Sequence, residues 1–159
     1  MAQVFTGSQV VELAIQIERN GAAFYEAAKK VVSGDEAKKT MDYLISEERR
    51  HLATFQGLLN KIELVRPAEQ YEGEWDAYLK TAAAEHVFTD DARAREIISS
   101  IKTQNEALDY AIGFEKDSIL LFLELSNLVG AKNKETVEKL VNEEKEHLRR
   151  LSELKRILK

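Results

Sequence analysis

The 159-residue sequence contains no cysteine and only one proline, Pro67. Without thiols the chain can form neither disulfides nor iron–sulfur clusters, and it has neither thiol catalysis nor zinc sites of the cysteine type. Proline interrupts helices, so its scarcity leaves long stretches free to be helical. The sequence also lacks an apolar run of the roughly 18–20 residues that a bilayer-spanning helix needs. We therefore expect no membrane association.

Positive charge is in short supply, because 23 lysines and arginines stand against 28 acidic residues and leave a net charge of −5. Nucleic-acid binding requires a basic surface, so we expect no nucleic-acid partner. The N-terminus has no basic start followed by an apolar stretch, which predicts no secretion signal and a cytoplasmic location. With 44% apolar and 32% charged residues, the composition is typical of one helix-rich globular domain over residues 1–159.

Apolar residues at helical spacing predict four long helices arranged as two hairpins. The expected helices are about 8–32, 36–62, 104–129 and 134–158, and the crossover 63–103 holds two short helical candidates, 75–84 and 91–100. Capping-box spacing marks the starts of the first and third helices, at Thr6–Gln9 and Thr103–Glu106, and Asp35 is the expected N-cap of the second. Tight turns and one long connection predict an all-α four-helix bundle with one crossover.

The second hairpin repeats the first in sequence. Residues 14–18 match residues 111–115 at an offset of 97, and residues 44–52 match residues 140–148 at an offset of 96. An internal repeat of this length indicates two copies of one structural unit. The repeat predicts that the bundle has pseudo-twofold symmetry.

Six polar side chains interrupt the apolar stripes of the four predicted helices. They are Glu18, Glu48, His51, Glu115, Glu144 and His147. A carboxylate in a core is costly unless it is paired or binds a metal, and no lysine or arginine lies in any stripe. Counted along the helices from the two turns, the six fall in one layer of the bundle. Four carboxylates and two imidazoles suit two divalent ions, and they fit iron or manganese better than calcium.

Two acidic residues that precede ligands have two interpretations. Glu47 and Glu143 are either solvated neighbours or hydrogen-bond partners of metal-bound histidines. Because successive residues are rotated by about 100° around a helix, the second interpretation places Glu143 beside His51 and Glu47 beside His147.

Tyr25, one heptad after Glu18, is either a core residue or a further partner of the ligands. His86, in the crossover, is expected to be a surface or loop residue, and its role is left open. Tyr71, Trp75 and Tyr78 are spaced to form one aromatic face that packs against the bundle or a partner subunit.

The pattern Glu18, Glu48-x-x-His51, Glu115 and Glu144-x-x-His147 resembles the ferritin-like di-iron carboxylate superfamily. The small size, the doubled Glu-Glu-x-x-His and the repeat look most like the rubrerythrin group. The resemblance implies a ferritin-like fold and two iron ions per chain, with manganese or zinc as alternatives in the isolated protein. In that arrangement Glu48 and Glu144 bridge or flank the ions, Glu18 and Glu115 are terminal, and each histidine binds one ion.

The resemblance also implies a function: a di-iron oxidoreductase that oxidises Fe(II) with hydrogen peroxide or dioxygen. An external electron donor, such as a separate rubredoxin, would re-reduce it, because the chain has no Cys-x-x-Cys motif of a rubredoxin domain. The alternative is a ferroxidase, an iron store or an iron or oxygen sensor without sustained turnover.

The chain departs from the rubrerythrin pattern at two places. Ser118 stands where rubrerythrins have an extra glutamate, and His147 stands where they have glutamate. The ligand set is closer to that of bacterioferritin, but Arg49 replaces the methionine that binds haem there, so we expect no haem. The chain has no fifth helix of the kind used in cages, and we expect a homodimer.

Overall fold

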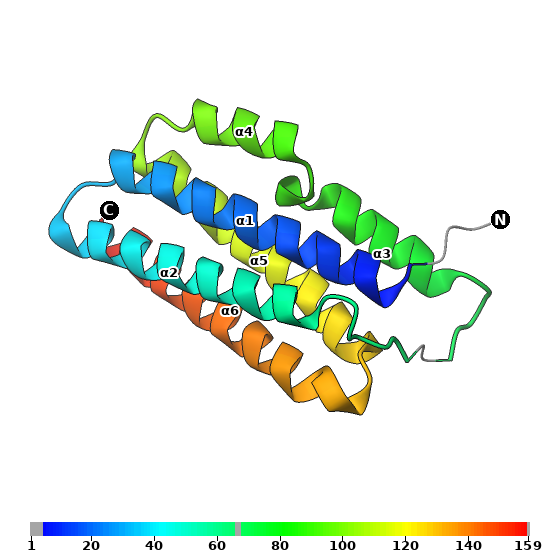
Figure 1. The fold of residues 1–159 in the computed structure, drawn as a ribbon. Helices are drawn as coiled ribbons and strands as arrows, with labels where there is room; N and C mark the ends of the chain where they lie inside the picture. Colours follow the sequence, from blue (N-terminus) through cyan, green and yellow to red (C-terminus); the bar gives the residue numbers. More distant parts are fainter. Residues whose placement is uncertain (1–4, 66–67, 159) are drawn as a thin grey trace.

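The computed structural model describes residues 5–65 and 68–158; Pro67, Arg66, residues 1–4 and Lys159 lie outside this part. The long helices are α1 (Gly7–Val31), α2 (Asp35–Leu58), α5 (Gln104–Leu128) and α6 (Ala131–Ile157), and the crossover holds α3 (Glu74–Glu85), the 3-10 turn η1 (Val87–Thr89) and α4 (Asp91–Ser100). The predicted all-α bundle with one long crossover is confirmed (Figure 1). In the described residues no helix is both long enough and apolar enough to span a bilayer.

The helix starts follow the capping signals with one exception. Thr6 Oγ1 accepts from the backbone N–H of Gln9, whose side chain accepts in return from the Thr6 N–H, and the Thr103–Glu106 pair does the same. The expected N-cap at Asp35 is wrong, because Gly34 with φ +89° occupies that position and Asp35 is the first helical residue. Glycine adopts this conformation without a Cβ clash, so it makes the α1–α2 turn.

The second helix ends four residues earlier than predicted, at Leu58 and not at 62. Leu59 is no longer helical, and Asn60 has φ 62°, the left-handed conformation that often terminates helices. The freed segment then pairs with the α5–α6 turn. Val65 N–H donates to the Leu128 carbonyl at 2.6 Å, and Gly130 N–H donates to the Glu63 carbonyl at 3.0 Å.

The crossover therefore runs the length of the bundle. It begins at the α5–α6 turn, and its far end is tied to the α1–α2 turn, where Ser33 N–H donates to the Gln104 side chain at 2.8 Å. This path makes α5 antiparallel to α1 and α6 antiparallel to α2. In Figure 1 the green crossover helices lie over α1 and α5, whereas α2 and α6 form the opposite side. Helix α4 and η1 contact α1, and α3 contacts α5.

Helix α1 comes unusually close to its neighbours at Gly21. A Cβ atom built at this position would lie 2.7 Å from Glu48 Oε2 and 2.7 Å from Phe114 Cζ. Glycine inside a helix normally costs about 1 kcal/mol relative to alanine. The close approach explains why α1 has glycine here, one turn after Glu18.

We expect Gly21→Ala to lower the free energy of unfolding by roughly 1–3 kcal/mol, because the added methyl overfills the space between three helices. Gly113→Ala in α5 is the matched control, since no atom lies within 4 Å of a Cβ built there. It should be neutral or stabilising by up to about 1 kcal/mol. Urea denaturation measures both variants, and equal effects of the two would contradict this account of Gly21.

Candidate metal centre

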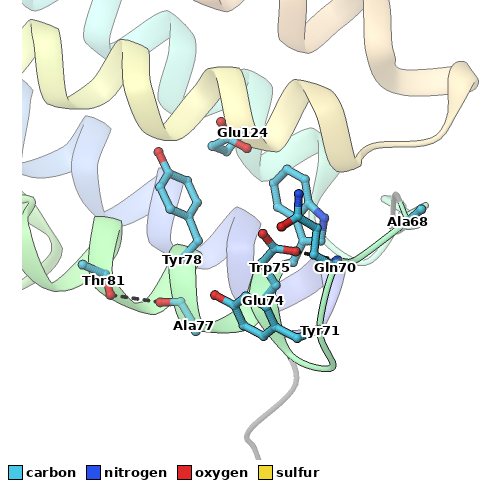
Figure 2. Close-up of a pocket in the computed structure, with 9 residues that line it drawn as sticks. All are labelled: Ala68, Gln70, Tyr71, Glu74, Trp75, Ala77, Tyr78, Thr81 and Glu124. Carbon is cyan, nitrogen blue, oxygen red and sulfur yellow. Dashed lines mark hydrogen bonds between the residues drawn. The ribbon is translucent and has the colours of Figure 1, made fainter.

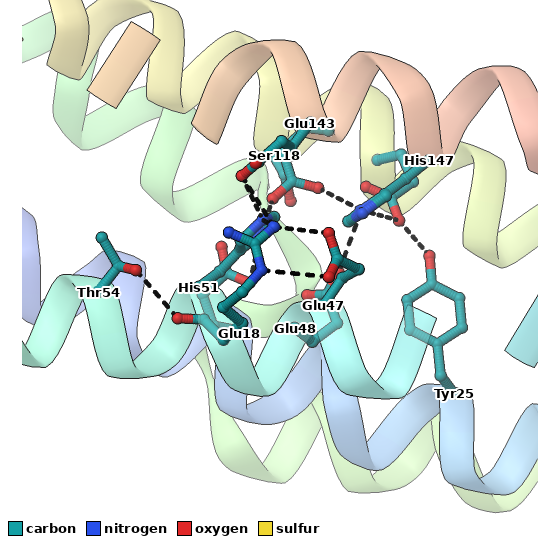
Figure 3. Close-up of polar contacts among 12 residues, drawn as sticks. Glu18, Tyr25, Glu47, Glu48, His51, Thr54, Ser118, Glu143 and His147 are labelled. Atoms are coloured by element: carbon teal, nitrogen blue, oxygen red, sulfur yellow. Dashed lines mark hydrogen bonds and ion pairs between the residues drawn. The ribbon is translucent and has the colours of Figure 1, made fainter. Parts of the chain in front are cut away.

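The six polar residues that interrupt the helix stripes meet in the middle of the bundle. Glu18 comes from α1, Glu48 and His51 from α2, Glu115 from α5, and Glu144 and His147 from α6. None of the six is more than 1% exposed. Their side chains converge between the helices (Figure 3). The predicted single layer is therefore present.

The six residues form two overlapping clusters. One consists of Glu18, Glu48, His51 and Glu144, and the other of Glu48, Glu115, Glu144 and His147. Within each cluster, one nitrogen or oxygen from every residue lies within 4.8 Å of the others. Glu48 and Glu144 belong to both. Two clusters with two shared carboxylates have the donor set and connectivity for a pair of ions.

Both histidines turn Nδ1 toward the carboxylates. His51 Nδ1 lies 2.7 Å from Glu144 Oε1 and 3.7 Å from Glu18 Oε2. His147 Nδ1 lies 3.0 Å from Glu144 Oε2, with Glu48 Oε1 at 3.5 Å. The two rings stack with their centroids 5.4 Å apart. The repeat-equivalent histidines thus face the shared carboxylate Glu144 from two sides.

Many of these buried atoms have no hydrogen-bond partner, although such groups are normally satisfied. Among the described residues nine buried side-chain atoms are unpartnered, and eight of them belong to these six residues. They include both oxygens of Glu18 and both of Glu48. His51 Nδ1 and Glu144 Oε1 make no hydrogen bond despite their 2.7 Å separation. Carboxylate lone pairs that converge without hydrogen-bond partners, as in Glu18 and Glu48, fit bound cations.

Burial dominates the electrostatics of three of the carboxylates. It raises the pKa of Glu18, Glu48 and Glu115 well above the ordinary value, and the neighbouring carboxylates raise these pKa values further. The protonated form is therefore favoured for these three residues in the metal-free protein. Metal binding must displace their protons, so it is coupled to proton release.

Glu144 and the histidines behave in the opposite way. Burial opposes the charge on Glu144, but the His147 and His51 rings outweigh it and hold the Glu144 pKa well below its usual range. Burial alone would lower the pKa of His147, but contacts with Glu144 and Glu48 raise it to about 9. The pKa of His51 is raised for the same reason. In the metal-free centre these contacts therefore favour the ionised form of Glu144 and the protonated form of His147, and they shift the pKa of His51 in the same direction.

On the outer side of the histidines, half of the expected reciprocal arrangement is present. His51 Nε2 lies 3.1 Å from Glu143 Oε2, which confirms the predicted contact. Glu47 lies within 4.8 Å of one ring nitrogen of His147, but His147 Nε2 has no hydrogen-bond partner among the described residues. The reason is Arg50, which holds Glu47 at 2.6 Å and also reaches Glu143 at 3.1 Å. The expected Glu47–His147 hydrogen bond is therefore wrong.

Tyr25 combines both of its sequence interpretations. Its ring is fully buried and packs against Phe24 and Phe114, so it is a core residue. Its hydroxyl also donates a hydrogen bond to Glu115 Oε1. This bond leaves Glu115 Oε2 without a hydrogen-bond partner, while Oε1 also lies 3.7 Å from His147 Nδ1.

His86 lies in the loop between α3 and η1, as one of the two expectations had it, but it is not at the surface. It follows α3 directly and is 1% exposed, because η1 folds it into the groove between α1 and α5. There Nε2 contacts Ser118 Oγ at 3.0 Å. Sequence reasoning missed Arg50 and the partnership with Ser118. In the sequence, Arg50 cannot be told apart from any other solvated arginine. The contact between His86 and Ser118 joins residues 32 positions apart, so no local sequence pattern indicates it.

The aromatic residues of the crossover lie outside the centre. Tyr71, Trp75 and Tyr78 line an open groove of about 710 Å³ that shares no residue with the two clusters. Figure 2 shows Trp75 and Tyr78 reaching from α3 toward Glu124 of α5. Trp75 packs partly on the core, while Tyr71 is 63% exposed. The groove therefore has no part in the chemistry of the buried carboxylates.

The raised pKa values predict how the stability of the metal-free protein depends on pH. A group whose pKa is raised by folding stabilises the fold below its unfolded value, about 6.5 for histidine, and this stability is lost as pH rises through the folded value. For His147 the folded value is about 9. The pKa values of His51 and of the three buried glutamates Glu18, Glu48 and Glu115 shift in the same direction.

We expect the melting temperature of chelator-treated protein to fall by roughly 5–10 °C between pH 6.5 and pH 9. Circular dichroism melts measure it. His147→Gln removes the histidine whose pKa is raised to about 9 and should make the melting temperature less dependent on pH. A melting temperature that stays constant or rises over this range in the parent protein would show that the histidines are not held protonated.

Comparison with known proteins agrees with this geometry. The sequence matches the rubrerythrin family over residues 9–155. A solved structure from Thermotoga maritima, described as a ferritin-like diiron-carboxylate protein, is 32% identical, with a TM-score of 0.70 over 96% of this chain and 95% of that chain. No curated protein matches the chain significantly. Because the family match covers nearly the whole bundle, the chain belongs to the rubrerythrin family of the ferritin-like di-iron superfamily.

Proposed function

We propose that the chain is a di-iron oxidoreductase that oxidises Fe(II) with hydrogen peroxide or dioxygen and is re-reduced by an external electron donor. The observation that carries the proposal is the pair of buried clusters that share Glu48 and Glu144. Membership in the rubrerythrin family supports iron as the metal, and so does the similarity to a protein described as diiron-carboxylate.

Each residue of the centre has a role in this proposal. Glu18 and His51 would hold one ion, Glu115 and His147 would hold the other, and Glu48 and Glu144, which belong to both clusters, would contribute to both. The histidines use Nδ1, the nitrogen that faces the carboxylates. When bound, the pair of ions supplies the two electrons that reduce a peroxide bond.

The protein around the centre orients the ligands and excludes water. The near-complete burial of the six residues keeps bulk solvent from the clusters. Tyr25 fixes Glu115 through its hydroxyl, and Glu143 fixes the ring of His51 through Nε2.

The decisive experiment combines metal stoichiometry with turnover. Anaerobic titration of the apoprotein with Fe(II) should saturate at two ions per chain. Steady-state peroxide consumption with a chemical electron donor should then continue through many cycles. Glu48→Gln removes a shared carboxylate and should abolish binding of the ion pair, whereas Glu135→Gln changes an exposed residue of the same bundle and should have no effect.

Two outcomes would count against the proposal. Saturation at one ion per chain would refute the dinuclear site. Two bound ions with peroxide consumption that stops after one stoichiometric cycle would refute sustained turnover and favour a ferroxidase, a store or a sensor.

The outer acids give a second prediction about the same centre. Glu143→Gln should weaken metal binding roughly 10-fold, because it removes the carboxylate that orients His51. Glu47→Gln should weaken it less than about threefold, because Glu47 is bonded to Arg50 and not to a ligand. Competition titrations with a metal-binding dye measure both affinities, with Glu135→Gln as control. Equal losses for the two variants would instead support a symmetric role.

A further inference from the structure

The groove between α1 and α5 holds a polar pair that the proposed ligand set does not use. His86 comes from the crossover and Ser118 from α5, and each is 1% exposed. Ser118 follows Glu115 by three residues, so the two share the face of α5 that looks into the bundle. Figure 3 includes Ser118 among the polar groups of the centre.

The hydrogen bonds of His86 determine which nitrogen carries its proton. The backbone N–H of Phe88 donates to His86 Nδ1 at 3.2 Å, so Nδ1 must be the unprotonated nitrogen. The proton is therefore on Nε2, 3.0 Å from Ser118 Oγ, and Nε2–H donates to that oxygen. Burial lowers the pKa of His86 to about 4, which keeps the ring neutral near pH 7.

The crossover holds the His86 ring rigidly. Thr89 Oγ1 donates to the carbonyls of Ala83 and His86, at 2.7 and 2.8 Å, and closes the turn after α3. The Asn20 side chain of α1 donates to the Phe88 carbonyl at 2.8 Å. The ring of Phe88 packs against Phe114 with their centroids 4.6 Å apart. His86 is thus anchored to both helices that border the groove.

In this arrangement the hydroxyl proton of Ser118 has no acceptor among the described residues. Ser118 accepts the hydrogen bond from His86, and no carbonyl or carboxylate of the described residues accepts one from Ser118. Two other donors around the centre already have acceptors, whereas His147 Nε2 has none among the described residues. Tyr25 donates to Glu115, and His51 Nε2 donates to Glu143. The Ser118 hydroxyl is therefore free to donate to a molecule that enters the centre.

We propose that Ser118 is a hydrogen-bond donor subsite for a small oxygen- or nitrogen-based anion of the hydroperoxide class, and that His86 is a positioning residue that keeps the Ser118 proton available. The inference rests on the proposed function, since it assumes that the clusters are loaded with metal. It assigns the ligand approach to the side of the centre covered by the crossover.

The charge of the metal-loaded centre explains why a neutral donor is suitable here. Two divalent ions and four carboxylates carry no net charge together, and a neutral hydroxyl can donate to a small anion there without adding a charge that competes with the metal. If His86 did not donate to Ser118, the hydroxyl could instead turn its proton to the ring nitrogen or to a carbonyl one turn back in α5, as buried serines in helices do. His86 therefore acts through Ser118 and not by contact with the ligand.

Azide, a redox-stable anion, is the probe for this subsite. The Fe(II)-loaded protein is titrated anaerobically with azide, and the dissociation constant is read from the near-infrared circular dichroism of the iron. Ser118→Ala should bind azide roughly 10-fold more weakly, the effect of one hydrogen bond to a charged acceptor. Ser126→Ala is the matched control, because Ser126 is also a buried serine of α5 but lies about 12 Å further along the helix. It should leave azide affinity unchanged.

His86 is tested separately from Ser118. His86→Phe should weaken azide binding, and His86→Gln, which keeps an N–H donor, should restore most of it. In the metal-free parent protein, ¹⁵N resonances of His86 should report the Nε2–H tautomer near pH 7. A ring protonated on Nδ1 would overturn the positioning role, whatever the activity of the loaded protein.

The outcomes separate this inference from the proposed function. If the parent protein fails to bind two ions, the proposed function and the donor subsite both fall. If the parent and Ser118→Ala both bind two ions and bind azide equally well, only the subsite falls. Loss of azide affinity in Ser126→Ala to the same extent would show a general effect of serine removal in α5 and would also overturn it.

Discussion

Four carboxyl groups buried in one layer of a helical core are the constraint on which the rest of the structure depends. No lysine or arginine of the described residues forms an ion pair with them, so their charge is balanced within the layer: two imidazoles favour the ionised form of Glu144, while the pKa values of the others rise. A core of this kind is a poor place for carboxylates unless cations occupy it. The close passage of α1 at Gly21, which brings Glu48 into place, belongs to the same constraint. The same buried carboxyl and imidazole groups therefore determine both the stability of the fold and its affinity for metal.

The two sides of this layer differ, although the sequence repeats. Between α2 and α6 the centre is bounded by Arg50 with Glu47 and Glu143, an ionic lattice that is partly exposed. Between α1 and α5 it is bounded by Phe88 of η1, by Phe114 of α5 and by the neutral His86–Ser118 pair. The first side is therefore charged and partly exposed, whereas the second is uncharged and buried. The single crossover creates this difference, because it covers only one of the two grooves.

Most of the fold and the ligand set could be predicted from the sequence because the spacing of apolar residues along each helix indicates them. Stripes with three- and four-residue steps define the helices, and a charge inside a stripe is visible without coordinates, as at Glu18 and Glu115. Capping boxes at Thr6 and Thr103 are equally local. The predictions that were wrong concern features that depend on residues far apart in the sequence. The early end of α2 depends on a left-handed Asn60 and on pairing with a turn about 65 residues later.

The same limit explains the errors at the edge of the centre. Helical rotation placed Glu47 near His147 correctly, but it could not weigh a neighbouring guanidinium that competes for the carboxylate. His86 lies in a segment without clear periodicity, so its burial depends on how η1 packs into the groove between α1 and α5. Sequence patterns predict which face of an element is buried. They do not predict which of two competing partners a polar side chain bonds to, or where an irregular segment folds back.

The sharing of Glu48 and Glu144 between the clusters also bears on the origin of the chain. The first hairpin supplies Glu18, Glu48 and His51, and the second supplies Glu115, Glu144 and His147, so each contributes three groups. Neither hairpin holds a four-residue cluster by itself, because each cluster borrows a shared glutamate from the other hairpin. An ancestral protein with a single hairpin would have completed such a centre only by pairing with a second copy of itself. Fusion of the two copies then freed the halves to diverge: the position of Gly21 in one half became Ser118 in the other.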